Sequence, residues 1–524
     1  MRIFFCLFFI THASFSQQWL GISTSNYSGT YNLAGNPANI ADSRYKLFLN
    51  LAGGNVDFIN NYAGWAAPFS FFGLSTNSVP SRYRASNGLP IFKPSYISEA
   101  LNQPNSVAFI ASDVKGPSLI YTFEKAKFAI GLTSRARMLI NLSNISSDLA
   151  HIMVNGTFIT NLYGSTQDNN YMTLNLNAFT EMGLTLGTII REQDQDFFKV
   201  GCTLKRLNGL ANIHYLVDNL DFTVDANSTK ANRQDVFLRN ASGTYGTTTN
   251  AAIRSFRPSP SWLLGNLPPG IGYGFDIGVI YEFRPEFDKY DVKVNGKWQK
   301  NGTKNKYLYR IGVALIDVGS INYNNPTYTN VIQIDKTNVL IPPGTFTKII
   351  SPDRLFYRMN DAFNINQSDY QHSFVVALPM ALSSNFDYKI SENIYLNATW
   401  IQSLRNPKTM GMNQPSMFAI TPRFESKRLD IALPISLQNG YRNLAFGVNV
   451  RVGPFFFGSD NIAGIVNIGN PKGISGYMGL YLPILKKLAN ISNDCYIEEK
   501  ITLRQEIRNI LKKHNQRRNW NRIR

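Results

Sequence analysis

The sequence predicts an all-β protein, a transmembrane antiparallel β-barrel of about 14 strands (roughly 12–16), followed by a short basic C-terminal helix. Three observations point to this fold class. Apolar and polar residues alternate in segment after segment, as in strands that have lipid on one face. Charged residues make up only 16% of the 524 residues, whereas aromatic residues reach 13%. No interior run approaches the roughly 20 consecutive apolar residues of a transmembrane helix.

The clearest alternating stretch covers residues 272–283. Its odd positions are all apolar or aromatic, and its even positions are small or acidic apart from Ile280. We expect the odd face to lie against lipid and the even face, with Asp276 and Glu282, to face the lumen. A strand of a soluble sandwich would also alternate. The recurrence of the pattern, and the aromatic residues at both ends of the apolar face, favour a membrane barrel.

Residues 1–16 are expected to form a signal peptide that is cleaved on export. Arg2 supplies the positive charge, residues 3–10 form an apolar run, and Ser14 and Ser16 provide the small residues of a cleavage site. The expected mature chain begins with a segment rich in Ser, Asn and Gly, residues 17–44, which either plugs the lumen or lines its rim. This segment contains Asn36, Pro37, Ala38 and Asn39, and an Asn-Pro pair is by itself an ordinary turn signal.

The predicted barrel covers residues 45–484, with a first strand at 45–51 and a last strand at 474–482. Two long polar stretches, 225–258 and 324–368, are expected to be extracellular loops, because such barrels alternate short turns with long outer loops. The other alternating runs begin at Leu119, Phe128, Met182, Phe198, Gly272, Tyr307, Met380, Ile394 and Leu444.

Residues 485–524 are expected to form a basic periplasmic tail. They hold eleven Lys and Arg residues against four Asp and Glu residues. Within them, residues 498–514 place isoleucine and leucine at roughly helical spacing, which predicts a basic helix. A solvated charged tail explains the same composition.

Several stretches resemble a known group of proteins. They include GPSLIYTF at 116–123, KVGCTLKRLNG at 199–209, GYGFDIGVIYEFRP at 272–285 and VRVGPFFFGSDN at 450–461. Together they resemble Bacteroidetes outer-membrane barrels of the domain of unknown function 5723 family, which are related in style to PorP/SprF proteins. The Asn36-Pro37-Ala38-Asn39 segment resembles the NPA element near the start of FadL-like and PorV-like outer-membrane proteins. In that group the element belongs to the lumen-occupying N-terminal part.

Nine charged residues are expected on lumen-facing positions of the strands. One interpretation is a salt-bridged interior that holds the barrel together. The other is a charged lumen that selects anionic or amphipathic solutes. The nine residues are Arg135, Arg137, Glu181, Lys199, Asp276, Glu282, Arg310, Asp387 and Arg451.

Nothing in the sequence predicts catalysis, a metal site or a cofactor. The five histidines are scattered and lack the spacing of a zinc site, and no GxSxG motif or phosphate-binding loop occurs. Cys202 and Cys495 lie far apart and are not expected to pair. We therefore expect a protein that is not an enzyme.

The expected function is passage of a small hydrophobic or amphipathic solute through the outer membrane, as the FadL-like element implies. The alternative is a non-catalytic scaffold or anchor for a secretion, gliding or envelope complex, as the PorP/SprF style implies. Expected partners are outer-membrane lipid, such a solute, and periplasmic or cell-surface proteins. The net charge of +18 would also suit nucleic acid, but export by a signal peptide argues against that partner.

Overall fold

The computed structural model describes residues 19–486, except 102–104, 124–126, 156–162, 226–234, 250–267, 287–291, 295–296, 300–301, 343–344 and 346–350. The expected signal peptide, and nearly all of the basic tail with its expected helix, lie outside the described residues. Within the described part of the chain, no helix is both long and apolar enough to cross a membrane.

The strands form one closed antiparallel barrel with 14 wall strands, which confirms the predicted fold class. The barrel closes where the last strand pairs with the first, from Tyr45 opposite Leu485 to Ile59 opposite Gly473. Four wall strands are interrupted in the middle and carry two labels each. The wall consists of β1 (Tyr45–Asn60), β4 (Ser106–Lys115) with β5 (Ser118–Phe123), β6 (Phe128–Ile145), β7 (Thr166–Gln193), β8 (Asp196–Val224), β10 (Gly270–Phe283), β13 (Tyr309–Tyr323), β15 (Phe374–Ala377) with β16 (Ala381–Lys389), β17 (Ile394–Ser403), β18 (Met417–Glu425), β19 (Leu429–Ala432) with β20 (Ile435–Gln438), β21 (Asn443–Phe446) with β22 (Val448–Val452), β23 (Phe455–Ser459) and β24 (Gly473–Leu485).

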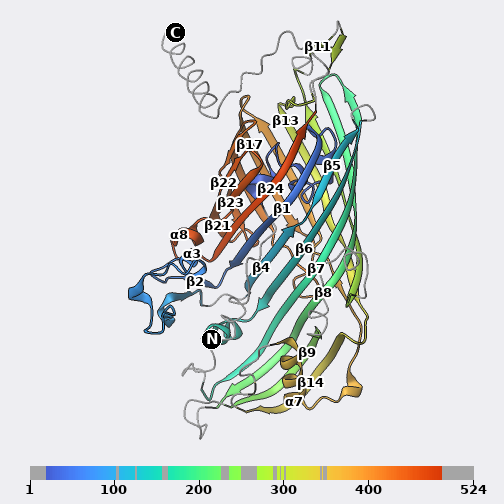
Figure 1. Ribbon diagram of the computed structural model, residues 1–524. Helices are drawn as coiled ribbons and strands as arrows, with labels where there is room; N and C mark the ends of the chain where they lie inside the picture. The colour runs from blue at the N-terminus through green and yellow to red at the C-terminus, as the bar shows by residue number, and fades with distance from the viewer. Residues whose placement is uncertain are drawn as a thin grey trace.

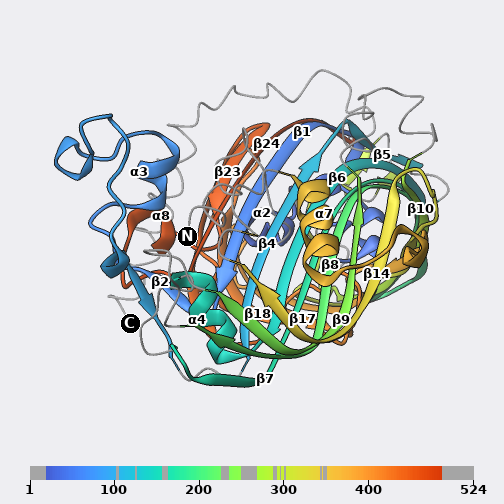
Figure 2. The same cartoon turned by 90° about the horizontal axis from the view of Figure 1, so that it is seen from below.

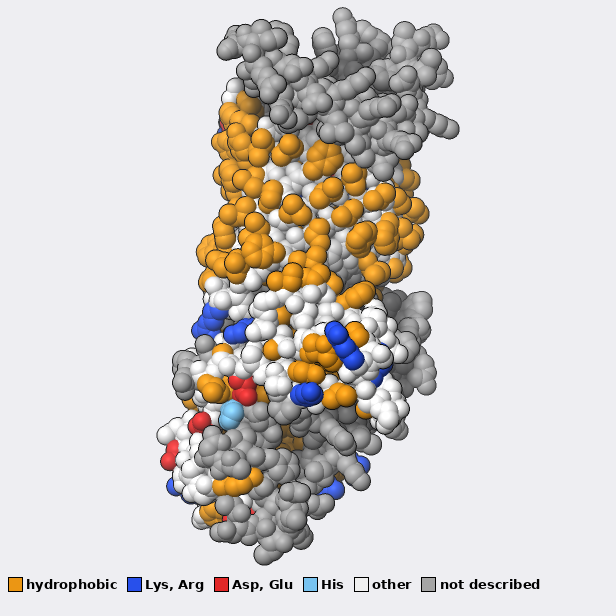
Figure 3. All heavy atoms as spheres, turned by 90° about the vertical axis from the view of Figure 1, so that its left-hand side faces the viewer, with side chains coloured by type: hydrophobic (Ala, Val, Ile, Leu, Met, Phe, Trp, Pro, Cys, Tyr) orange, Lys and Arg blue, Asp and Glu red, His pale blue; other side chains and the backbone are white. Residues whose placement is uncertain are grey.

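Alternation along each wall strand separates an outer face from a lumen face, and β10 shows it clearly. Tyr273 and Ile277 are 66% and 51% exposed, whereas Asp276 and Glu282 are 1% and 3% exposed. Figure 3 shows hydrophobic side chains covering the upper part of the wall, with Lys, Arg, Asp and Glu side chains below them. A closed barrel with an apolar outer band is the architecture of outer-membrane proteins, which places the chain in an outer membrane.

The two ends of the barrel differ in their connections. The start of β1 and the end of β24 lie together at the upper end in Figure 1, where short turns such as residues 453–454 join neighbouring strands. The opposite end carries long connections such as residues 61–105. Short turns face the periplasm and long loops face outward in barrels of this kind. We call these the short-turn end and the long-loop end.

A sheet extension at the long-loop end departs from the sequence prediction. The distal half of β8 pairs with β9 (Val236–Thr248), and β9 pairs with β14 (Thr329–Ile341). Both strands lie in stretches that were expected to be loops, so that expectation is wrong. Helix α7 (Pro352–Phe363) packs against this sheet through two buried phenylalanines (Figures 1 and 2). Polar residues on the open face of β14 hide the strand pattern, because this sheet stands outside the lipid.

The connection from β1 to β4 folds into a small unit around Trp65, with Phe69 and Tyr96 in its core. It packs beside α8, since helix α3 contacts α8. The short elements outside the wall are β2 (Ala63–Trp65), α3 (Phe71–Ser75), η3 (Ser81–Tyr83), η4 (Pro94–Tyr96), β3 (Ile97–Glu99), α4 (Ser147–Asn155), β11 (Val292–Val294), β12 (Lys297–Gln299), η7 (Gln367–Asp369) and α8 (Ala463–Val466).

Replacing Ile277 by Arg should destabilise the barrel in bilayers by about 2–4 kcal/mol, because the guanidinium would face hydrocarbon near the middle of β10. Unfolding by urea from lipid vesicles measures the loss. The matched control is Leu340→Arg, on the sheet extension, where the leucine is 56% exposed and a surface substitution should cost no more than about 0.5 kcal/mol. Equal losses of stability in both variants would contradict the assignment of Ile277 to the lipid-facing wall and of Leu340 to the region outside the lipid.

Candidate functional site: the occupied lumen

The N-terminal segment occupies the lumen of the barrel. It contains helix α2 (Leu20–Ser23) and the 3-10 helices η1 (Gly29–Tyr31) and η2 (Pro37–Ile40). In the view from the long-loop end, α2 lies inside the ring of wall strands (Figure 2). Most side chains of this segment are buried. The sequence left open whether the segment plugs the lumen or lines its rim, and we call residues 19–42, which lie within the lumen, the plug.

The first part of the plug is held by aromatic packing and by two main-chain hydrogen bonds. The ring of Trp19 lies 5.7 Å from that of Tyr477 and 6.0 Å from that of Phe456. The Leu20 N–H donates to Asp460 Oδ2 at 3.0 Å, and the Gly21 N–H donates to the Tyr477 hydroxyl at 3.1 Å. These contacts bind α2 to β23 and β24.

The NPA part of the plug is fixed by the side chain of Asn36. Its Oδ1 accepts the Ala38 N–H at 2.9 Å, so the residue caps η2, as the turn reading of Asn-Pro requires. Its Nδ2 donates to the carbonyls of Val279 and Val313, at 3.1 and 3.3 Å. One side chain therefore shapes the local turn and also ties the plug to wall strands β10 and β13.

Glycines in the wall make this close approach possible. A Cβ atom on Gly201 would lie 2.5 Å from the main-chain carbonyl of Pro37, and one on Gly278 would overlap the side chain of Asn36. A Cβ on Gly312 would lie 3.1 Å from Asn36 Nδ2. Gly278, one of the even-numbered glycines of residues 272–283, is therefore a position at which the plug contacts the wall directly.

Four charged candidates, Arg135 and Arg137 of β6, Glu181 of β7 and Asp276 of β10, meet in one buried cluster. Arg137 Nη2 lies 2.8 Å from Asp317 Oδ2, and Arg137 Nη1 lies 3.2 Å from Glu181 Oε2. Lys205 Nζ lies 2.6 Å from Asp276 Oδ1. Since Arg137 is on β6 and Asp317 on β13, this central cluster joins wall strands that are not neighbours. The cluster comprises Asp113, Arg135, Arg137, Glu181, Lys205, Asp276 and Asp317.

The other charged candidates belong to smaller ion-pair groups nearer the short-turn end. Lys199 Nζ lies 3.0 Å from Glu282 Oε1. Arg310 lies 3.2 Å from Asp387, and Arg451 Nη2 lies 2.6 Å from a carboxylate oxygen of Asp430.

All nine candidates thus carry an ion pair, and six of their partners were not singled out from the sequence. For partners on neighbouring strands, such as Lys205 of β8 beside Asp276 of β10, the signal that could have found them is the shared lumen-facing register. The partners are Asp113, Lys205, Arg284, Asp317, Arg423 and Asp430.

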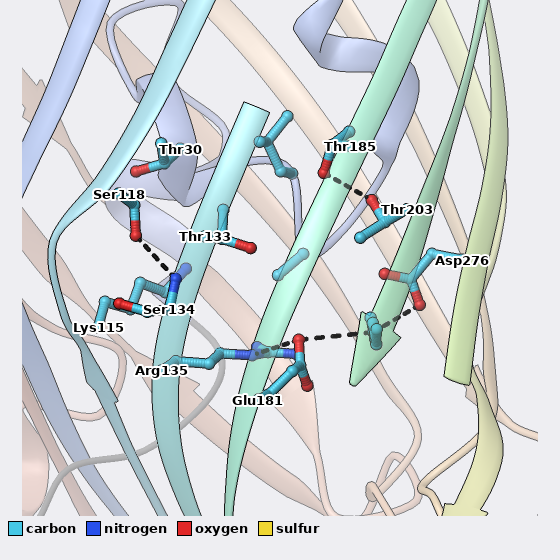
Figure 4. A pocket seen from close by; sticks show the side chains of 13 residues that line it. Thr30, Lys115, Ser118, Thr133, Ser134, Arg135, Glu181, Thr185, Thr203 and Asp276 are labelled. Carbon is cyan, nitrogen blue, oxygen red and sulfur yellow. Dashed lines mark hydrogen bonds and ion pairs between the residues drawn. The ribbon is translucent and has the colours of Figure 1, made fainter. Parts of the chain in front are cut away.

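A small cavity lies between the plug and the central cluster. It is lined by Thr30 and Leu33 of the plug and by Thr133, Arg135 and Glu181 of the wall. Figure 4 shows the wall side chains converging on it, with hydrogen bonds and ion pairs joining several of them. The cavity has a volume of about 30 Å³, which is room for roughly two water molecules. A larger solute does not fit in this cavity with the plug in place.

A second segment closes the lumen toward the long-loop end. Residues 404–416, between β17 and β18, cross the barrel and contact the lumen faces of β6 and β7. Asn141 donates to the carbonyl of Asn413 at 2.6 Å and accepts its N–H at 3.0 Å. Met412 is fully buried in an apolar cluster with Phe179, Tyr323 and residues of neighbouring strands. We call residues 404–416 the inner loop.

Replacing Asp387 by Asn should destabilise the barrel by about 3–5 kcal/mol, because Arg423 and Arg310 would lose a buried carboxylate partner. Urea unfolding from vesicles measures the loss. Glu192→Gln is the control, since its partner Lys127 is 54% exposed and such a pair contributes about 0–1 kcal/mol. A loss in Asp387→Asn no greater than in the control would contradict the structural role of the network.

Acid should loosen the junction between the plug and β1. Burial raises the pKa of the Asp42 carboxyl, but Arg284, Lys486 and Lys199 outweigh burial and hold that pKa below its ordinary value. A carboxyl whose pKa is lowered by folding stabilises the fold at every pH above its pKa in the unfolded chain, which is about 4. This stabilisation is lost as the pH falls below that value. Between about pH 6 and pH 3, thermal midpoints should therefore fall more steeply for the unaltered protein than for Asp42→Asn. Parallel curves would contradict this.

Comparison with known proteins identifies the family. The chain matches the model of a family described as "Family of unknown function (DUF5723)" over residues 37–460. No curated protein matches it.

Three solved structures show limited likeness. The Ralstonia pickettii toluene transporter TbuX is 9% identical at a TM-score of 0.36 (90% of this chain and 99% of that one). A Pseudomonas aeruginosa FadL homologue is 12% identical at 0.29 (90% and 100%). The CymD monoaromatic hydrocarbon channel is 7% identical at 0.31 (90% and 98%). Scores this low transfer neither solute nor role. The family match, by contrast, covers well over half of the sequence, and the chain belongs to the DUF5723 family of unknown function.

Proposed function

We propose that this barrel passes a small amphipathic solute across the outer membrane when its plug moves. The observation that carries the proposal is the arrangement of two layers of opposite polarity along the lumen. The layer around the inner loop is apolar, with Phe179, Tyr323 and Met412. The layer beside the plug is charged, with the central cluster and its small cavity. A solute that carries both apolar and polar groups finds partners in each layer.

The segments that block the lumen are separable from the wall. The plug is attached by the aromatic packing of Trp19 and by hydrogen bonds that involve side chains, such as those of Asn36 and of Ser25 with Asp430 at 2.9 Å. The wall is held by continuous main-chain pairing around the closed barrel. Movement of the plug therefore breaks a limited set of contacts and leaves the barrel intact.

A scaffold function is the second candidate, and the long-loop end favours it. The small unit and the sheet extension project beyond the wall and expose large apolar side chains. Phe72, Leu89, Leu101 and Tyr357 are 53%, 63%, 59% and 60% exposed. Exposed apolar side chains outside the lipid suit contact with a cell-surface protein. On this reading the lumen stays closed and the barrel serves as an anchor.

Replacing Gly201 by Val should increase solute passage, because the new side chain would push the main chain at Pro37 out of its seat. Swelling of liposomes that contain the folded protein, in solutions of small amphipathic solutes, measures passage. Cys202→Val is the matched control, since Cys202 is the next residue along β8 and faces outward, where a valine meets only lipid.

The two candidates predict different outcomes. Passage that rises in Gly201→Val, with Cys202→Val unchanged, supports a solute path. If Gly201→Val folds, as heat-modifiable gel migration would show, and both variants remain impermeable to every solute tested, the path proposal fails. Copurification of a surface protein that depends on Phe72 and Leu89 would then favour the scaffold.

A further inference from the structure

Arg206 is an arginine on the lipid-facing side of the wall. Its neighbours in β8, Lys205 and Leu207, face the lumen and are 4% and 0% exposed, so Arg206 points outward. Across the outer face it lies opposite Met182 of β7 and Tyr273 of β10. Lys205 is fully engaged inside the barrel with Asp276 and Asp317, and the two basic residues therefore have separate environments.

The position of Arg206 along β8 corresponds to the outer edge of the apolar band. Ten residues separate it from Asp196, where β8 begins at the short-turn end. At about 3.3 Å per residue and a tilt near 40°, this is a height of roughly 25 Å, close to the height of the apolar band of such barrels. Tyr273, beside it, is 66% exposed, as expected of an interfacial aromatic residue. Arg206 is thus at the level of outer lipid headgroups.

Arg206 has no carboxylate partner among the described residues. Its Nε atom is buried and makes no hydrogen bond within the described part of the chain. A guanidinium on the lipid face is costly unless an anion or water satisfies it. Acidic side chains do not supply that anion here, so a ligand from the membrane is the remaining source of a negative charge.

An apolar groove runs along the outer wall next to Arg206. It has a volume of about 390 Å³, within the range of small-ligand sites. Leu132, Leu184 and Leu204 from three adjacent strands line it. The wall is interrupted here, because Pro117 between β4 and β5 has no N–H, and Ser134 of β6 donates its hydroxyl to the Pro117 carbonyl at 2.9 Å.

We propose that this groove and Arg206 form a binding site for a membrane lipid with an anionic headgroup. The apolar chain would lie along Leu132, Leu184 and Leu204, and a headgroup phosphate would take the guanidinium of Arg206. A guanidinium binds phosphate through two parallel hydrogen bonds, which an ammonium cannot do. The site lies on the outer face and is therefore independent of passage through the lumen.

The test uses the folded, full-length mature protein in detergent, with phosphatidylglycerol as the anionic probe and phosphatidylcholine as the zwitterionic one. Native mass spectrometry measures bound lipid. The unaltered protein should retain phosphatidylglycerol in preference to phosphatidylcholine. Arg206→Gln should weaken phosphatidylglycerol binding at least about tenfold, as expected when a charged hydrogen bond is lost. Leu204→Trp, which fills the groove and keeps the charge, should weaken binding as well.

Arg354→Gln is the matched control, because it removes the same charge from an exposed residue of α7, away from the groove. It should bind phosphatidylglycerol like the unaltered protein. Equal binding by Arg206→Gln and Arg354→Gln would overturn the proposal. The proposal would also be overturned if inorganic phosphate alone released the bound lipid and Leu204→Trp bound phosphatidylglycerol as tightly as the unaltered protein. That result would indicate a phosphate site that does not hold a lipid chain.

Discussion

The occupied lumen depends on the close approach of the plug to glycines of the wall. Without a side chain on Gly201 and Gly278, the main chain at Pro37 and the side chain of Asn36 reach the inner surface of the sheet. The Asn36 amide then bonds two wall carbonyls while its oxygen caps the turn that follows. A larger residue at either glycine would displace the segment and with it the floor of the small cavity.

Barrel width explains why the interior needs both charged side chains and inserted segments. Side chains fill the lumen of a barrel with about eight strands, but a 14-strand wall is too wide for short residues to meet across it. Long arginine, lysine and glutamate side chains span more of this distance, as in the Arg137–Asp317 pair between β6 and β13. Because a buried charge without a partner is very costly, these residues occur as networks and not singly.

The wall could be predicted from sequence because each of its strands repeats one local rule, lipid on one face and lumen on the other. The outward face of β10 and the lumen-facing register of Arg135, Asp276 and Asp387 follow from that rule alone. Their partners do not, since the Arg137–Asp317 pair depends on which strands face each other across the lumen. β9 and β14 were missed because neither face of the extension meets lipid, so polar residues interrupt the pattern.

The inward course of the inner loop could not be predicted from the sequence either. Nothing local in residues 404–416 distinguishes an inward loop from an outward one, and its burial depends on asparagines of β6 and β7 that accept and donate main-chain hydrogen bonds. The plug and the inner loop close the lumen from opposite ends and attach to different parts of the wall. The described plug has no strand pairing with the wall, whereas the inner loop has one isolated bridge, between Gly411 and Ala377 of β15. The closed sheet is thus held by strand pairing and the plug by aromatic packing and side-chain hydrogen bonds, which is the arrangement that the proposed movement of the plug requires.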